Sequence, residues 1–101
     1  MTLPNGYEMT TTFWMDFSIA DAFGIKAVKD TFNRAFNEWK SNYVYLTELV
    51  ITLNLKIWQH YEKNGSCEFS RLYNELWEQA DNFACENLKG EELDFFYRIT
   101  D

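Results

Sequence analysis

The side chains that most often carry chemistry are scarce in this sequence. It contains one histidine, His60, and two cysteines, Cys67 and Cys85. A zinc or iron site needs three or four ligands at recognisable spacing, and the sequence has neither a Cys-x-x-Cys pair nor two histidines four residues apart. Nothing marks either thiol as an activated nucleophile beside His60. We therefore expect no metal and no cofactor, and a His60 that packs against an aromatic neighbour at the edge of a helix.

Carboxylates and glycines do not supply a catalytic site either. A hydrolase that works through two carboxylates needs one of them in an apolar pocket, whereas the acids here fall on the polar faces of predicted helices. The four glycines form no loop of the kind that cradles phosphate. The sequence predicts no catalytic residues and favours a protein that is not an enzyme. The alternative is a small ligand-binding protein or enzyme with an aromatic-lined pocket near His60.

Charge is distributed unevenly along the 101 residues, whose formal net charge is -7. Residues 1–64 hold 7 acidic and 6 basic side chains, while residues 65–101 hold 9 acidic and 3 basic ones. An acidic half repels phosphate backbones and anionic membranes, so we expect no direct binding of nucleic acid and no membrane association. We expect a protein partner with a basic surface instead. The predicted interaction surface consists of Glu68, Glu75, Glu78, Asp81, Glu86, Glu91, Glu92 and Asp94.

A second hypothesis for this acidic surface is mimicry of DNA. The five carboxylates between Glu68 and Glu86 would occupy about 27 Å of helix, or one per roughly 7 Å, at a rise of 1.5 Å per residue. A DNA strand carries one phosphate per about 3.4 Å. A DNA-mimic inhibitor would need the acids after Gly90 and a second subunit to reach that density.

The apolar periodicity predicts an all-α fold in a single domain, residues 1–101. Three main helices are expected at about 25–40, 43–64 and 67–88, with short helices near 18–23 and 91–98. Because the connections are short, consecutive long helices should run antiparallel in a compact bundle. Residues 1–17 contain a Pro-Asn-Gly turn signal and a Thr-rich segment of β propensity, and they are expected to form an extended or short-strand arm.

The predicted helix 43–64 carries apolar residues on two faces instead of one. Leu46, Leu49 and Leu53 mark the first face, and the second lies about 130° away at 100° per residue. Such a helix needs neighbours on both sides, or one face must meet another molecule. Thr47 and Asn54 lie between the two faces, so one or both should be partly buried and hydrogen-bonded if both faces are covered. The candidate dimer or partner surface consists of Val44, Ile51, Leu55 and Trp58, joined by Phe13 and Trp14 of the arm.

The cysteines and the N-terminal segment indicate a cellular compartment. Cys67 and Cys85 would lie about 27 Å apart in one helix, whereas a disulfide allows about 4.4–6.8 Å between Cα atoms. We therefore expect reduced thiols, which are typical of a reducing compartment. No apolar run approaches the roughly 20 residues of a membrane-spanning helix, and no basic residue precedes Lys26, so we expect a cytoplasmic protein.

Two stretches resemble a group of bacterial proteins. The Phe-Trp-Met-Asp-Phe-Ser-Ile-Ala-Asp-Ala-Phe-Gly-Ile run that begins at Phe13, and the Glu-Leu-Trp-Glu-Gln-Ala-Asp run that begins at Glu75, are similar to small acidic helical proteins of plasmids, phages and conjugative elements. That group has no assigned activity, so the resemblance implies only an accessory role. Such proteins often bind a host or element protein. Together with the acidic half, this predicts a non-enzymatic interaction module, with a homodimer as a possible assembly.

Overall fold

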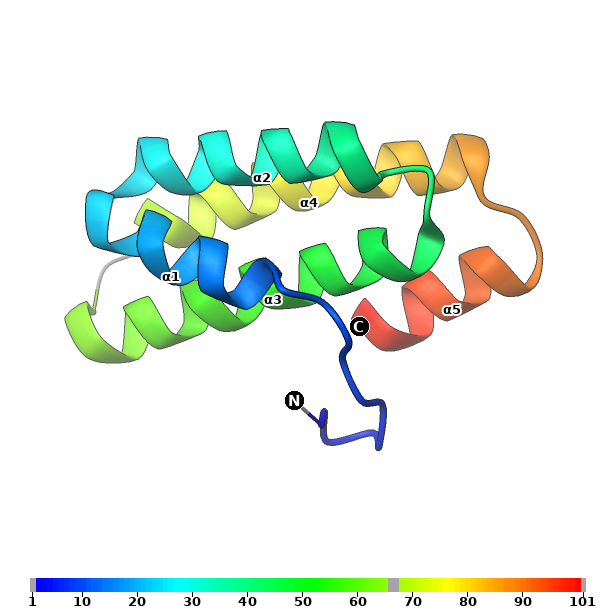
Figure 1. Cartoon of the computed structure of the whole chain (residues 1–101), viewed down its shortest axis with the longest axis horizontal. Helices are drawn as coiled ribbons and strands as arrows, with labels where there is room; N and C mark the ends of the chain where they lie inside the picture. Colours follow the sequence, from blue (N-terminus) through cyan, green and yellow to red (C-terminus); the bar gives the residue numbers. More distant parts are fainter. Residues whose placement is uncertain (1, 66–67, 101) are drawn as a thin grey trace.

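The computed structural model describes residues 2–65 and 68–100, and within them the chain forms five helices (Figure 1). Their bounds are α1 Phe13–Phe23, α2 Ile25–Trp39, α3 Tyr43–Asn64, α4 Glu68–Asn87 and α5 Glu91–Thr100. The predicted all-α bundle is confirmed, and its three main helices lie within one residue of their expected ends in the described residues. Position 67, where the third main helix was expected to begin, lies outside the described residues.

Side chains and glycines fix the ends of α3. The Asn42 side chain accepts hydrogen bonds from the backbone amides of Val44 and Tyr45, at 3.1 and 3.2 Å, and so satisfies two donors of the first turn. Gly65 ends the helix at φ 64°, in the left-handed region where a Cβ is unfavourable. Gly24, which separates α1 from α2, also has a positive φ, 99°, but with an extended ψ of -173°. The predicted stop at Gly65 is therefore confirmed, for the expected stereochemical reason.

α3 is the central helix and packs against each of the other four. Figure 1 shows α2 and α4 along one side of it, α1 against its C-terminal half and α5 against its N-terminal half. With 22 residues α3 is about twice as long as α1 or α5, which have 11 and 10. Each short helix therefore covers only part of α3. The radius of gyration is 13.0 Å, the size expected of a compact domain of this length.

The N-terminal prediction is wrong for residues 13–17, which begin α1 instead of ending an arm. Phe13, Phe17 and Ala20 fall on one helical face and are buried in the core. Ser18, where the short helix was expected to begin, lies inside α1, and its hydroxyl donates to the Trp14 carbonyl at 2.9 Å. Burial of this face outweighs the low helix propensity of the aromatic residues.

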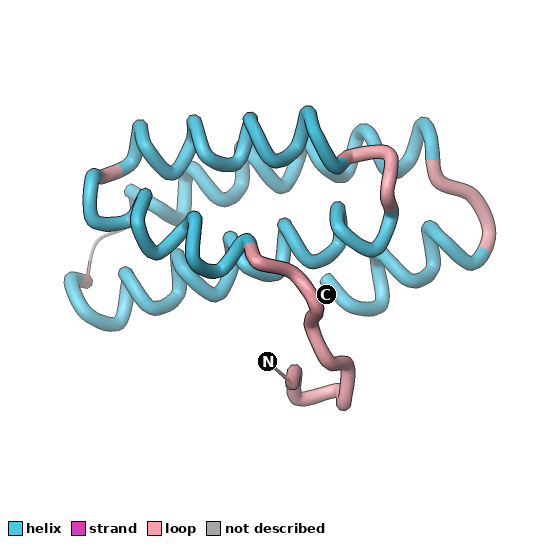
Figure 2. The backbone as a smooth tube through the Cα atoms, in the orientation of Figure 1, coloured by secondary structure: helices cyan, strands magenta, loops and turns pink. Residues whose placement is uncertain are grey.

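The remaining arm, residues 2–12, is mostly extended. It contains one isolated antiparallel bridge, between Thr2 and Glu8, closed by a turn in which the Leu3 amide donates to the Tyr7 carbonyl at 2.8 Å. Figure 2 draws this segment as loop. An extended arm is thus correct over these residues, but the strand pair reduces to a single bridge.

The structure describes one of the two thiols and the five helices that bear on membrane insertion. Cys85 is exposed and free. The prediction that Cys67 cannot pair with it falls outside the described residues. Among the helices described, none combines the length and the apolar character that a bilayer crossing requires.

Candidate functional site

The predicted acidic surface lies on α4 and α5. Seven of its eight carboxylates are exposed, and only Asp81 is half-buried. Lys29 of α2 approaches one of them, with its Nζ 3.0 Å from the Glu75 carboxylate. An ion pair this exposed contributes little to stability. The other exposed acids of these two helices can act on a partner through their position on the surface: Glu68, Glu78, Glu86, Glu91, Glu92 and Asp94.

Asp81 has a structural role instead. It accepts a hydrogen bond of 2.6 Å from the Tyr97 hydroxyl and so ties α4 to α5. That hydrogen bond, together with contact with the Cys85 thiol and burial, raises the pKa of Tyr97 above its ordinary value. The charge of Asp81 is directed toward its own neighbour, which removes it from the surface open to a partner.

The predicted apolar partner surface is only partly open. Ile51 and Phe13 are buried inside the chain, and Val44 and Leu55 are half-buried. The prediction that Ile51 and Phe13 lie on a partner surface is therefore wrong. α5 covers the N-terminal half of α3, and α1 carries Phe13 into the core. Trp58, which lies beyond the end of α5, is 58% exposed.

Trp14 is half-buried, and it packs under a cation. The Lys56 Nζ lies 3.7 Å from the centre of its ring, within the range of a cation–π contact. Burial lowers the pKa of Lys56, against the opposing attraction of Asp21. This contact ties α1 to α3, so Trp14 serves the fold more than a partner surface.

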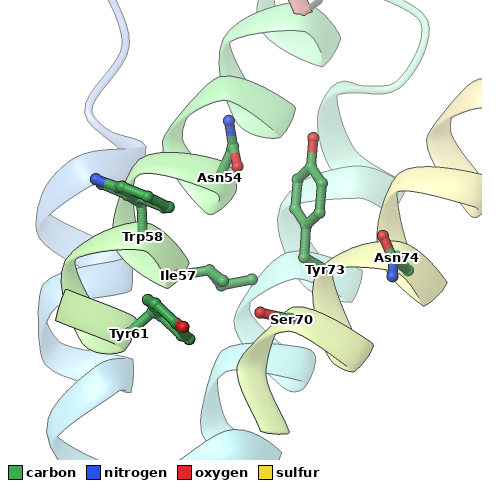
Figure 3. Close-up of a pocket in the computed structure, with 7 residues that line it drawn as sticks. All are labelled: Asn54, Ile57, Trp58, Tyr61, Ser70, Tyr73 and Asn74. Atoms are coloured by element: carbon green, nitrogen blue, oxygen red, sulfur yellow. The ribbon is translucent and has the colours of Figure 1, made fainter. Parts of the chain in front are cut away.

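An aromatic groove of about 380 Å³ lies between α3 and α4. Figure 3 shows Trp58 and Tyr61 on the α3 side, Ile57 between the helices, and Tyr73 on α4. The Trp58 and Tyr61 rings are nearly parallel, with centroids 6.0 Å apart and an angle of 22° between their planes. The rest of the lining is polar and uncharged: Asn54, Ser70 and Asn74.

His60 is not part of this groove. Its ring lies on Phe69, with centroids 3.9 Å apart, and its Nδ1 is 3.6 Å from the Asp21 carboxylate. The prediction of a boundary histidine packed on an aromatic ring is therefore confirmed. The aromatic groove is lined by Trp58 and Tyr61, which flank His60 in the chain, whereas His60 itself is not among the lining residues.

The sequence analysis missed a buried carboxylate, Glu48 of α3. Its side chain is fully buried and accepts hydrogen bonds from the Tyr7 hydroxyl and the Thr10 amide, both 2.9 Å long. The Thr10 hydroxyl donates to the same carboxylate at 3.3 Å. Burial first, and the hydrogen bond from its own hydroxyl to Glu48 second, raise the pKa of Tyr7 to about 12. We call these three side chains, Tyr7, Thr10 and Glu48, the arm latch, because they hold the arm on α3.

A second feature that the sequence analysis missed is an apolar ridge on α1. Met15, Ile19 and Phe23 are spaced four residues apart and are 66%, 59% and 78% exposed. They line the face of α1 opposite to its buried residues, so the helix is apolar on both sides. The four-residue spacing was the signal that could have revealed them. We call these three residues the α1 ridge.

No metal centre is apparent in residues 2–65 and 68–100, where no three His, Cys, Asp or Glu side chains come together as a ligand group. Comparisons with protein-family models, with curated proteins and with solved structures find no match to this chain. Its function must therefore be inferred from its own surfaces.

Proposed function

We propose that this protein is a non-enzymatic interaction module that presents its acidic C-terminal half to a basic protein partner. The observation that supports the proposal is the exposure of seven carboxylates on α4 and α5. The likeness of two stretches to proteins of mobile elements supports an accessory role in the bacterial cytoplasm as part of the same proposal. Charges of one sign on one surface accelerate encounter with an oppositely charged partner and select against acidic ones.

Neutralising four of these acids should abolish capture of the partner. The test variant is Glu78→Gln, Glu86→Gln, Glu91→Gln and Glu92→Gln, all at exposed positions. We expect the wild type to retain basic proteins at about 0.1 M NaCl and to release them at about 1 M, where the Debye length falls from about 10 Å to about 3 Å. Affinity capture followed by mass spectrometry of the bound proteins measures both effects.

A matched control removes the same number of charges elsewhere. Glu8→Gln, Asp16→Asn, Glu38→Gln and Glu62→Gln change four exposed acids of the N-terminal half. This variant should capture the same proteins as the wild type. Equal loss in both variants would mean that only net charge matters, and the proposed surface would be wrong. Displacement of the captured protein by duplex DNA would favour the DNA-mimic form of the proposal.

A homodimer remains part of the proposal, with the α1 ridge as its surface. Three exposed apolar side chains on one helical face can pair with the same face of a second copy in a two-fold arrangement. The contact is small, so the dimer should dissociate on dilution. Light scattering should give a mass above 12.1 kDa that rises with concentration for the wild type, and 12.1 kDa throughout for Ile19→Glu. Trp58→Glu, at an equally exposed position on α3, should behave as the wild type; a wild type that stays monomeric removes the homodimer.

Ligand binding is a second candidate function. The aromatic groove between α3 and α4 favours it, because pockets between bundle helices that combine apolar walls with a few polar groups are common ligand sites.

A further inference from the structure

The aromatic groove owes its existence to the short α5. The ten residues of α5 extend about 15 Å along α3, which is itself about 33 Å long. The C-terminal part of α3 therefore turns Trp58 and Tyr61 toward solvent at 58% and 43% exposure. Two large rings that stack on each other at the rim of a groove form a flat surface on which a third ring can lie.

The polar lining of the groove suits the edge of a ring with both donors and acceptors. Asn54 and Asn74 each carry an amide that donates and accepts, and Ser70 adds a hydroxyl. Figure 3 shows Asn54 on the α3 side of the groove and Ser70 and Asn74 on the α4 side. Within the described residues, none of these three side chains forms a hydrogen bond of its own, so all are available to a ligand.

The charge of the groove lining limits which ring compounds the groove can bind. None of the seven residues that line the groove is acidic or basic. A bound anion would meet no cation there, and it would be repelled by a chain of net charge -7. A bound cation would likewise find no carboxylate in the lining. The groove is therefore unsuited to an anion, and its three uncharged polar side chains match the hydrogen-bonding edge of a neutral ring better than a cation.

We infer that the groove between α3 and α4 binds a small, uncharged, planar heteroaromatic ring of the nucleobase or nucleoside class. The ring stacks on Trp58, and its edge exchanges hydrogen bonds with Asn54 and Asn74. This inference deepens the second candidate function and is independent of the acidic surface on α4 and α5.

Titration of the ¹⁵N-labelled protein with adenosine tests the inference. We expect saturable shifts of the Trp58 indole NH and of the side-chain amides of Asn54 and Asn74. Because stacking of a base on an aromatic side chain contributes strongly, Trp58→Ala should weaken binding about tenfold or more. Gln59→Ala, at an exposed position of the same helix outside the groove, should bind as the wild type. Far-UV circular dichroism of both variants checks that the helices remain.

The other arms of the titration separate the alternatives. Adenosine 5′-monophosphate should bind more weakly than adenosine, and tighter binding would overturn the charge assignment. Binding of a methyl glucoside in place of adenosine would overturn the ligand class. No shift at millimolar adenosine, or equal affinity for Trp58→Ala, would overturn the site. A protein that binds adenosine but captures no basic partner would keep this inference and remove only the acidic-surface proposal.

Discussion

Phe17→Ala is expected to lower the free energy of unfolding by about 3–5 kcal/mol. The Phe17 side chain is fully buried, and it anchors α1 in the core formed with α2 and α3. Removing the ring takes away its transfer free energy and leaves a cavity that surrounding helices fill only in part. Urea unfolding followed by circular dichroism measures the loss, provided that the slope of the transition is unchanged.

Met15→Ala is the matched control, two residues away on the same helix. Met15 is 66% exposed on the α1 ridge, so its truncation should change stability by no more than about 0.5 kcal/mol. Alanine has the higher helix propensity at both positions and the gain is larger at Phe17, so propensity cannot explain a loss of stability in Phe17→Ala. Equal effects at the two positions would contradict the docking of α1, because only docking distinguishes Phe17 from Met15.

Phe17 also shows why the sequence predicted the long helices better than α1. In α2 and α4 the apolar residues recur on one side with polar residues opposite, and the pattern alone defines the helix. In α1 both faces are apolar, so the periodic contrast vanishes, and local propensity favours an extended segment. Burial of Phe17 against other helices makes residues 13–17 helical, and the local sequence pattern contains no sign of that burial.

The two faces of α3 illustrate partial success. The prediction that both need neighbours is correct for Ile51, which is buried, and for Thr47, whose buried hydroxyl donates to the Tyr43 carbonyl at 2.7 Å. Trp58 stays exposed, since α5 ends before reaching it, so at this position the alternative of contact with another molecule stays a prediction. The sequence shows which residues share a face, but the extent of the covering helix depends on how the chain folds back.

The candidate sites differ in the same respect: some lie on one helix and others join residues far apart in the chain. Exposure of the acids on α4 follows from helical periodicity, which places them opposite Leu72 and Leu76. The aromatic groove joins residues of two helices, and the arm latch joins Glu48 to residues about 40 positions earlier in the chain. Neither pairing has a local signature. Glu48 offered one clue, since it precedes Ile51 and Leu55 on an apolar face at helical spacing.

Glu48→Gln is expected to lower the free energy of unfolding by about 1–3 kcal/mol and to release residues 2–12 from α3. The substitution keeps the size of the side chain but removes the charge that strengthens the hydrogen bonds from Tyr7 and Thr10. Amide hydrogen exchange should show faster exchange at the Thr10 NH. Glu62→Gln, at an exposed position on the same helix, should leave both stability and exchange unchanged.

The pKa of Tyr7 distinguishes a weakened latch from an open one. Folding raises this pKa from 10.0 to about 12, so the stabilising contribution of the latch is complete below pH 10 and is lost as the pH rises through 12. Burial is the larger cause and the hydrogen bond to Glu48 the smaller one. In Glu48→Gln a docked arm should therefore keep part of the shift, whereas a released arm should return the pKa to about 10. Tyrosinate absorbance, compared with Tyr7→Phe to isolate this group among 6 tyrosines, measures the value. An unshifted Tyr7 in the wild type would contradict the latch, because both causes require the arm to lie against α3.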